Sequence, residues 1–255
     1  MTIGIIGNGV VGSTLAKWFK DAKVYDIDPT RSPHSLEEVS GCDMIFIAIN
    51  LKENASTTAE YAMLVEYAER TGPGATVVIK TTVVPGTCSR LENRFRPFTT
   101  LPYKKILYNP EFLTEAHPWR DFLDPSLQVI GHNGNLDAAE KLHYLLPKAF
   151  KFATVTFEQA EWLKLAVAGF LSTKVSFFNQ LYDAFGKENF DIVSDLMTHD
   201  PRIGQYGRDI LQNGYRGWGG KCFTKDVPLF AALSKMPLVQ EAVRYNSILI
   251  TGGKT

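Results

Sequence analysis

Two segments of the sequence contain residues suited to ligand binding or catalysis, and the first is the run Gly7-Asn8-Gly9-Val10-Val11-Gly12. It follows a short apolar stretch directly. In such a run the first glycine permits a tight turn, the second lets the backbone approach a pyrophosphate, and the third allows close packing of a helix on a strand. The phosphates then lie at the helix N-terminus, where N–H groups and the helix dipole favour an anion. The run therefore predicts a dinucleotide-binding site.

An acidic residue supports this prediction. Asp26 ends the second apolar stretch, close to the roughly 20 residues beyond the glycines at which a carboxylate accepts hydrogen bonds from both ribose hydroxyls. Because its charge would repel a ribose 2′-phosphate, NAD is predicted rather than NADP, although Arg31 nearby could attract such a phosphate. The alternative is a tight strand-to-helix turn that binds no ligand.

The second group is Gly217-Trp218-Gly219-Gly220-Lys221-Cys222-Phe223-Thr224-Lys225-Asp226. A cysteine that follows flexible glycines and lies beside a cation can be held as a thiolate and act as a nucleophile. A buried structural cysteine in a turn is the alternative. The other cysteines, Cys42 and Cys88, are too widely spaced for a disulfide framework or a CxxC metal site, and the histidines show no ligand spacing, so no metal is expected.

The composition restricts the kind of partner. Among 255 residues, 27 Lys and Arg balance 27 Asp and Glu, so no net charge would attract nucleic acid or an anionic membrane. The chain shows no basic leader and no apolar run long enough to span a bilayer. We therefore expect a cytoplasmic protein with small-molecule partners, and neither nucleic acid nor membrane.

The elements that must position these residues alternate along the first half of the chain, which is typical of a parallel sheet covered on both faces. Strands are expected at Ile3–Gly7, Lys23–Ile27, Met44–Ile49, Thr76–Lys80, Lys105–Tyr108, Leu127–Gly131 and Phe152–Thr156. Helices are expected between them at Val11–Asp21, Ser56–Arg70, Thr87–Phe95 and Leu136–Leu145.

The second half of the chain has a helical pattern. Glu158–Phe185 predicts one long helix, because it holds no proline and a single glycine in its interior. Shorter helices are expected at Asp191–Met197, Val227–Ser234 and Leu238–Leu249. The sequence therefore predicts an α/β fold, with a Rossmann doubly wound parallel sheet over residues 1–157 and a helical domain with a long central helix over residues 158–255.

Several segments resemble the UDP-glucose/GDP-mannose dehydrogenase family. Residues 217–226 are similar to the family signature GFGGxCFxKD, with Trp218 in place of the usual phenylalanine. Further similar segments follow the family's order along the chain, at residues 80–87, 109–116, 125–131, 161–166, 174–179 and 200–204. The resemblance covers nearly the whole chain.

This resemblance implies oxidation of a primary alcohol on a nucleotide sugar to a carboxylate, with two NAD reduced in turn. Lys164 and an ordered water would help to remove the hydroxyl proton, and Cys222 would form a thiohemiacetal and then a thioester with the substrate. Lys164 would stabilise the developing oxyanion. Glu111 and Asp226 would position or activate water for hydrolysis, and Thr82 would hold a catalytic water.

The resemblance also implies binding residues. Those expected to contact the cofactor are Gly7, Asn8, Gly9, Val10, Val11, Gly12, Asp26, Asn50, Thr82, Glu115 and Lys225. Those expected to contact the substrate are Glu111, Phe112, Leu113, Lys164, Arg202 and Gly219. Because family members pair through the long helix, and an apolar face follows Leu238, we also expect a homodimer.

Each role has a structural alternative. Lys164 could be a solvated helix lysine, although its apolar neighbours indicate a partly buried face. Glu111 and Glu115, four residues apart, could merely cap or solvate a turn. Asp226 could cap a helix that begins at Val227.

The sequence also departs from the family. Ala168 stands where the family has an asparagine, a second oxyanion donor, and Lys221 precedes the cysteine where a small residue is usual. Asn50-Leu51-Lys52-Glu53 replaces a threonine-proline pair close to the cofactor, and the family's second nucleotide-binding-like domain is not in the sequence. Three functions therefore stay open: an active nucleotide-sugar dehydrogenase, a catalytically weak NAD-binding protein or subunit of a split enzyme, and a short β-hydroxyacid dehydrogenase that uses a lysine without a cysteine.

Overall fold

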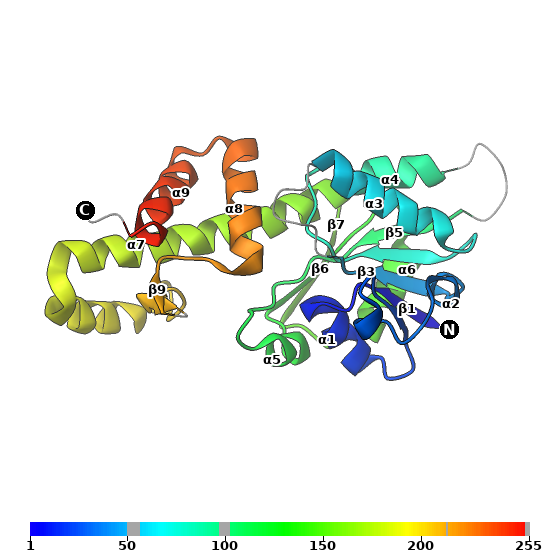
Figure 1. Ribbon diagram of the computed structural model, residues 1–255, viewed down its shortest axis with the longest axis horizontal. Helices are drawn as coiled ribbons and strands as arrows, with labels where there is room; N and C mark the ends of the chain where they lie inside the picture. The colour runs from blue at the N-terminus through cyan, green and yellow to red at the C-terminus, as the bar shows by residue number, and fades with distance from the viewer. Residues whose placement is uncertain (50–56, 97–102, 213, 253–255) are drawn as a thin grey trace. The chain divides into compact units, whose positions relative to one another are not determined.

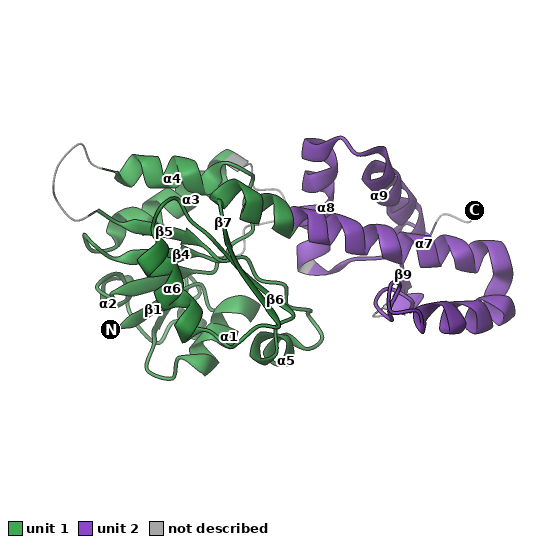
Figure 2. Cartoon of the chain, turned by 180° about the vertical axis from the view of Figure 1, so that it is seen from behind, with its two compact units in different colours: residues 1–164 green, residues 165–255 purple. Residues whose placement is uncertain are grey.

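A computed structural model of the chain describes residues 1–49, 57–96, 103–212 and 214–252 (Figure 1). The chain divides into two compact units, coloured separately in Figure 2: unit 1 is Met1–Lys164 and unit 2 is Leu165–Thr255. Unit 1 contains a large sheet with helices, whereas unit 2 contains helices and a two-stranded hairpin.

Unit 1 is built on a sheet with the strand order β2-β1-β3-β4-β5-β6-β7. Its strands are β1 (Ile3–Ile6), β2 (Lys23–Tyr25), β3 (Met44–Ile47), β4 (Thr76–Ile79), β5 (Lys105–Tyr108), β6 (Leu127–Gly131) and β7 (Lys151–Val155). The predicted Rossmann sheet is confirmed. Strands β1 to β5 are parallel, whereas β6 runs antiparallel to β5 and parallel to β7. The sequence did not indicate this reversal, because the apolar residues that mark a buried strand do not encode its direction.

Helices cover both faces of the sheet (Figure 1). On one face lie α2 (Leu36–Ser40), α3 (Thr57–Arg70), α4 (Thr87–Phe95) and the first turn of α7. On the other face lie α1 (Val10–Trp18), α5 (Pro118–Leu123) and α6 (Leu136–Leu145). Ile5 and Ile6, adjacent in β1, belong to the two different cores, because successive strand side chains point to opposite faces. The sheet is therefore rigidly held on both sides.

The carboxyl ends of β1 to β5 lie at the same edge of the sheet, because these strands are parallel. β6 meets β5 at the pair Tyr108 and Gly131, which are the last residues of their strands. Since the two strands are antiparallel, the rest of β6 continues beyond the carboxyl end of β5. Ligands of open parallel sheets bind at this edge, outside the carboxyl ends of the strands.

The long helix is α7 (Phe157–Thr198), which begins in unit 1 and continues into unit 2. The helix expected over Glu158–Phe185 is confirmed. Gly186 follows it with φ 70°, outside the helical region, and the chain then resumes a helix over the segment expected at Asp191–Met197. Glycine adopts such a positive φ without steric strain, so this residue allows the interruption.

Unit 2 also contains β8 (Leu211–Gln212), β9 (Tyr215–Arg216), α8 (Gly220–Ser234) and α9 (Pro237–Ile250). The helix predicted at Val227 begins earlier, at Gly220, and Pro228 lies inside it. In a helix that began at Val227, Pro228 would lie in the first turn, where proline is common. Packing of α8 on α9 outweighs the local penalty of an interior proline. Asp226 is therefore inside the helix, and its interpretation as a cap is wrong.

Five short elements of the described residues were not predicted: α2, α5, β8, β9 and the 3-10 turn η1 (Pro29–Arg31). Asp28 caps η1 by accepting a hydrogen bond from the Thr30 N–H. Over the ranges that the structure describes, no helix is both long and apolar enough to cross a membrane.

Candidate functional site

The glycine-rich turn connects β1 to α1. Gly7 has φ 94°, and a Cβ there would lie 2.6 Å from the Ala48 carbonyl oxygen. A Cβ on Gly12 would lie 1.7 Å from the Gly7 carbonyl oxygen, so only glycine fits either position. A Cβ on Gly9 would meet no atom within 4 Å, and no side chain caps α1 at this residue. The tight turn, the close helix contact and the open space at the helix start together fit a dinucleotide pyrophosphate.

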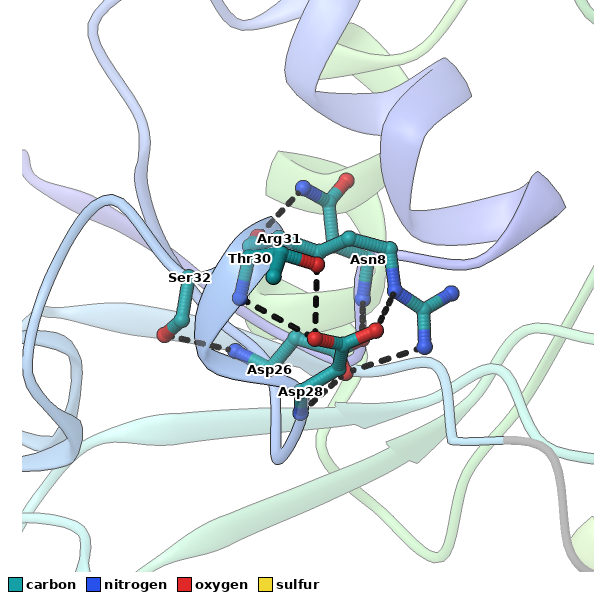
Figure 3. Close-up of polar contacts among 6 residues, drawn as sticks. All are labelled: Asn8, Asp26, Asp28, Thr30, Arg31 and Ser32. Atoms are coloured by element: carbon teal, nitrogen blue, oxygen red, sulfur yellow. Dashed lines mark hydrogen bonds and ion pairs between the residues drawn. The ribbon is translucent and has the colours of Figure 1, made fainter.

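Asp26, at the end of β2, is nearly buried and lies beside this turn (Figure 3). Its Oδ2 accepts a hydrogen bond of 2.6 Å from the Asn8 N–H, and its Oδ1 accepts one of 2.9 Å from the Asp28 N–H. The Arg31 guanidinium lies 3.4 Å from the same Oδ1. The carboxylate expected to face a ribose is thus joined to the glycine-rich turn and neutralised in part by a half-exposed arginine.

This pairing leads to a prediction about cofactor preference. Asp26→Asn removes the charge that repels a 2′-phosphate and frees Arg31 to pair with one. We expect NADH to bind about tenfold more weakly and NADPH to bind more tightly, because a charge-assisted hydrogen bond to the ribose is lost. Fluorescence titration with both cofactors measures the ratio. Asp28→Asn, which removes the other carboxylate that contacts Arg31, is the matched control; an unchanged ratio in Asp26→Asn would contradict the prediction.

A second group lies where β5 ends and α7 begins. The Lys164 Nζ is 3.6 Å from the Glu111 Oε1, and both side chains are about nine-tenths buried, at 10% and 11% exposed. The other Glu111 oxygen accepts a hydrogen bond of 2.6 Å from the Leu113 N–H, and the Phe112 ring centre lies 5.8 Å from the Lys164 Nζ. Glu111 therefore caps a turn and also pairs with Lys164. Lys164 is buried rather than solvated.

Lys80 and Asn109 belong to the same region, and no role was predicted for either from the sequence. The Lys80 ammonium, at the end of β4, donates a hydrogen bond of 2.8 Å to the Asn109 Oδ1, and both residues are buried. Burial lowers the pKa of Lys80 to about 8. A lysine directly after a buried strand was the only available signal, since that position faces the carboxyl edge of the sheet.

Glu161 is a further residue that sequence reasoning missed. It lies one turn before Lys164 on α7 and is completely buried. Its carboxylate accepts hydrogen bonds of 2.6 Å from the Gly86 N–H and 2.8 Å from the Cys88 N–H, at the start of α4. Burial raises the pKa of Glu161. The contact ties the turn that carries Lys164 to the loop after β4, where Thr82 lies.

The remaining unit 1 candidates are placed as follows. Thr82 and Val11 are half-buried, whereas Val10 and Glu115 are exposed. Asn50 lies outside the described residues.

Unit 2 carries the cysteine motif on the first turns of α8. Cys222 is exposed, Lys225 is half-buried and Asp226 is buried at 3% exposure. Cys222 thus lies in the first turn of a fifteen-residue helix, where N–H groups and the helix dipole favour a thiolate. The expected reactive position is therefore an exposed one rather than a buried structural turn.

The segment ahead of Cys222 is fixed to two helices of unit 2. The Trp218 N–H donates a hydrogen bond of 2.7 Å to the Asn246 Oδ1 on α9, and its indole N–H donates one of 3.2 Å to the Ser176 Oγ on α7. The Arg216 guanidinium lies 2.6 Å from the Asp183 Oδ1 on α7. Trp218 is buried at 3% exposure, so it packs rather than faces a ligand.

The last two substrate candidates also lie in unit 2. Gly219 immediately precedes α8, and a Cβ there would meet the Tyr215 hydroxyl at 2.2 Å. Arg202 has an 88% exposed side chain that pairs with Asp200 at 2.6 Å.

Across the described parts of both units, no cluster of three or more His, Cys, Asp or Glu side chains could hold a metal ion.

A parallel sheet with a glycine-rich turn after β1 and an acidic residue at the end of β2 defines a dinucleotide-binding Rossmann unit. Sequence comparison agrees, because residues 30–146 match the NAD binding domain of the UDP-glucose/GDP-mannose dehydrogenase family and residues 158–247 match its central domain. The chain belongs to this family. The first matched range begins after Asp26, so the assignment of the glycine-rich turn rests on the geometry above.

Curated relatives include a UDP-glucose 6-dehydrogenase of Rickettsia conorii, 32% identical over 201 residues that make up 74% of this chain and 44% of the relative. A putative UDP-glucose 6-dehydrogenase of Bacillus subtilis is 33% identical over 216 residues, which are 79% of this chain and 48% of the relative. The chain thus spans less than half the length of these two relatives.

Solved structures show the same fold. A UDP-glucose dehydrogenase of Pyrobaculum islandicum gives a TM-score of 0.77 at 24% identity, over 96% of this chain and 68% of that one. A UDP-D-ManNAc dehydrogenase of Pyrococcus horikoshii gives 0.79 at 20% identity, over 98% of this chain and 69% of that one.

Proposed function

We propose that this chain carries out the NAD-dependent oxidation of a nucleotide sugar at C6, from alcohol to carboxylate. The observation that carries the proposal is the gathering of its candidate groups at one edge of the sheet. Gly7 follows β1, Asp26 follows β2 and Glu111 follows β5, all at the carboxyl ends of parallel strands. A cofactor site and a buried ion pair at a common edge are what oriented hydride transfer requires. The names of the curated relatives support the substrate class.

In the first oxidation, a hydride leaves C6 and the hydroxyl proton must be taken up nearby. NAD supplies the hydride acceptor. Lys164, buried and paired with Glu111, is suited to take up or relay that proton through a water, because burial and a charged neighbour tune such a group. Thr82 would hold this water, and Glu111 and Phe112 would contact the sugar. The product of this step is the aldehyde.

In the second oxidation, the Cys222 thiolate adds to the aldehyde carbon, and the oxygen takes a proton to give a thiohemiacetal. Loss of the hydroxyl proton and of a second hydride from C6, for which a second NAD would be the acceptor, gives a thioester. Water then attacks the thioester carbon, which releases the carboxylate and returns the sulfur to Cys222. Lys164 would stabilise the oxyanion of this step, and Asp226, one turn after Cys222 on α8, would orient the water.

Ala168 favours a second candidate function, a catalytically weak NAD-binding protein. Ala168 lies on α7 one turn after Lys164, is buried at 4% exposure and offers no side-chain donor to an oxyanion. Loss of one oxyanion donor lowers rates by about a hundredfold or more. An enzyme with this residue would be slow, and a chain selected only for NAD binding would tolerate it.

The chain would also pair with a second copy. Phe170 and Phe177, two turns apart on α7, are 68% and 52% exposed, and Leu238 on α9 is 63% exposed. Large apolar side chains on one helix face are typical of an interface. Light scattering of the purified chain tests the expected homodimer, which a monomer would contradict.

A screen for NADH formation tests the proposed function. The purified chain is incubated with NAD and a panel of UDP- and GDP-sugars, with UDP and GDP alone as controls. Two equivalents of NADH per sugar and a sugar carboxylate by mass spectrometry are expected. NAD binding without NADH formation on any sugar would overturn the proposal in favour of the weakly catalytic candidate.

A further inference from the structure

The side-chain amide of Asn246, on α9, is a buried polar group that the proposed chemistry does not use. The residue is 4% exposed. Its Oδ1 accepts a hydrogen bond of 2.7 Å from the Trp218 N–H, and its Nδ2 donates one of 2.9 Å to the Trp218 carbonyl. Asn246 therefore holds Trp218 by both of its backbone groups, as a paired residue of a neighbouring strand would.

The surroundings of this amide fix its place. Gly217 has φ 88°, and a Cβ there would overlap the Asn246 Oδ1, so only glycine lets the chain approach the amide this closely. Tyr245, the residue before Asn246, donates a hydrogen bond to the Asp183 carboxylate on α7. The turn of α9 that carries the amide is therefore itself fixed to α7.

The start of α8 depends on this hold, because the residues at its start do not define one. Gly219 precedes the helix without a side-chain cap, and Gly220 has φ 78°, outside the helical region. Two successive glycines permit many backbone directions. Trp218 restricts them, because its fixed carbonyl belongs to the peptide bond that leads to Gly219. Its ring also packs edge-to-face on Phe223, in the first turn of α8, with 6.3 Å between the ring centres.

We propose that Asn246 is a positioning residue for Cys222: by holding Trp218, it sets where the first turn of α8 begins and so keeps the thiol beside the N–H groups that favour its thiolate. The inference rests on the proposed function only in taking Cys222 as the nucleophile. A helix start stabilises a thiolate only where its first turn is formed, because the effect falls off within that turn. Asn246 acts through Trp218 and needs no contact with the substrate.

The test compares alkylation of Cys222 with and without the Asn246 amide. Leucine has the branched shape of asparagine but neither donates nor accepts a hydrogen bond, so Asn246→Leu removes both contacts with Trp218. The rate constant for iodoacetamide at pH 7 is measured by mass spectrometry of the Cys222 peptide. It is expected to fall about three- to tenfold in Asn246→Leu, because a smaller fraction of the thiol is ionised. A rate that is unchanged or higher would overturn the inference.

Two variants on α9 are the matched controls. Val239→Ala removes buried packing two turns before Asn246, and Gln240→Leu removes an exposed amide. Both are expected to leave the alkylation rate of Cys222 unchanged. If this rate fell as far in Val239→Ala as in Asn246→Leu, a general loss of stability would explain both results and the inference would be wrong.

Two further measurements cover the case in which Asn246→Leu does not fold. Cys42 and Cys88 are buried, so their alkylation reports unfolding of a variant. Hydrogen exchange of the unmodified chain then decides. The Trp218 amide is expected to exchange at least about a hundredfold more slowly than in an unstructured peptide, and to open together with the first turn of α8. Exchange of this amide at the rate of an unstructured peptide would refute the proposed hold.

Alkylation and hydrogen exchange need no turnover, so they remain decisive if no nucleotide sugar is oxidised. Where the chain is active, Asn246→Leu is expected to slow the second oxidation about a hundredfold, because the nucleophile is misplaced, and to leave the first oxidation and the KM for NAD unchanged. An equal loss of both oxidations would mean that Asn246 is only structural, and would overturn the inference.

Discussion

Cys222→Ser is expected to stop the oxidation of a nucleotide sugar after one equivalent of NADH, and to lower the rate of carboxylate formation at least about a thousandfold. The second oxidation needs a nucleophile that captures the aldehyde. A serine hydroxyl in the same place is nearly all protonated at neutral pH, whereas a thiol in the first turn of a helix is readily ionised. The measurement is NADH released per sugar, together with mass spectrometry of the sugar product.

The control for this experiment is Cys42→Ser. Cys42 is buried at 4% exposure and its thiol contacts the Glu38 carbonyl at 3.7 Å, so serine is accommodated there and the site is untouched. Two equivalents of NADH are expected from Cys42→Ser. If Cys222→Ser also gave two, the thioester route would be refuted. Unchanged turnover of a hydroxyacid by Cys222→Ser would instead identify a β-hydroxyacid dehydrogenase.

The fold was largely predictable because its strands are short apolar runs between helical patterns. The bounds of β5, β6, α4 and α6 agree with the sequence expectations. What the sequence did not indicate depends on tertiary contacts. The reversal at β6 is set by pairing at Tyr108 and Gly131, and the early start of α8 is permitted by packing on α9 despite Pro228. A local pattern holds neither kind of information.

The candidate site was predictable where a residue's type and its position along the chain together indicate a function, as for the glycine-rich turn and Asp26. Lys164 and Glu111 were expected from family resemblance, and the structure adds that they form a buried ion pair. Partners that meet only across the fold were missed. Glu161 contacts residues 73 or more positions away in sequence, and Lys80 and Asn109 are 29 apart. No spacing rule connects such pairs, because the sheet brings them together.

The burial of Lys80 has a consequence for stability that is independent of any activity. Its pKa is lowered by burial to about 8 in the folded chain, below the 10.5 of a fully solvated lysine. Between these values the unfolded chain binds a proton that the folded chain releases, so the free energy of unfolding rises with pH in that range. Below pH 8 Lys80 is protonated in both the folded and the unfolded chain, so the folded chain bears the full free-energy cost of burying its charge.

Lys80→Met removes this penalty, and with it the pH dependence. Relative to Lys80→Met, the unmodified chain is expected to gain on the order of 2 kcal/mol in free energy of unfolding between pH 7.5 and pH 9.5. Urea unfolding of both proteins at the two pH values gives the difference, in which the titration of all other groups cancels. The loss of the Lys80 to Asn109 hydrogen bond shifts the difference equally at both pH values, so it does not affect the gain.

The exposed Lys20, in the same unit, provides the matched control for the loss of one lysine charge. Its substitution by methionine is expected to give the same difference at both pH values, because its ammonium is in contact with water in either state. If the difference in free energy of unfolding between the unmodified chain and Lys80→Met were the same at both pH values, as is expected for the Lys20 variant, water or an anion would be stabilising the Lys80 charge in the folded chain. In that case Lys80 would keep its proton over the whole pH range.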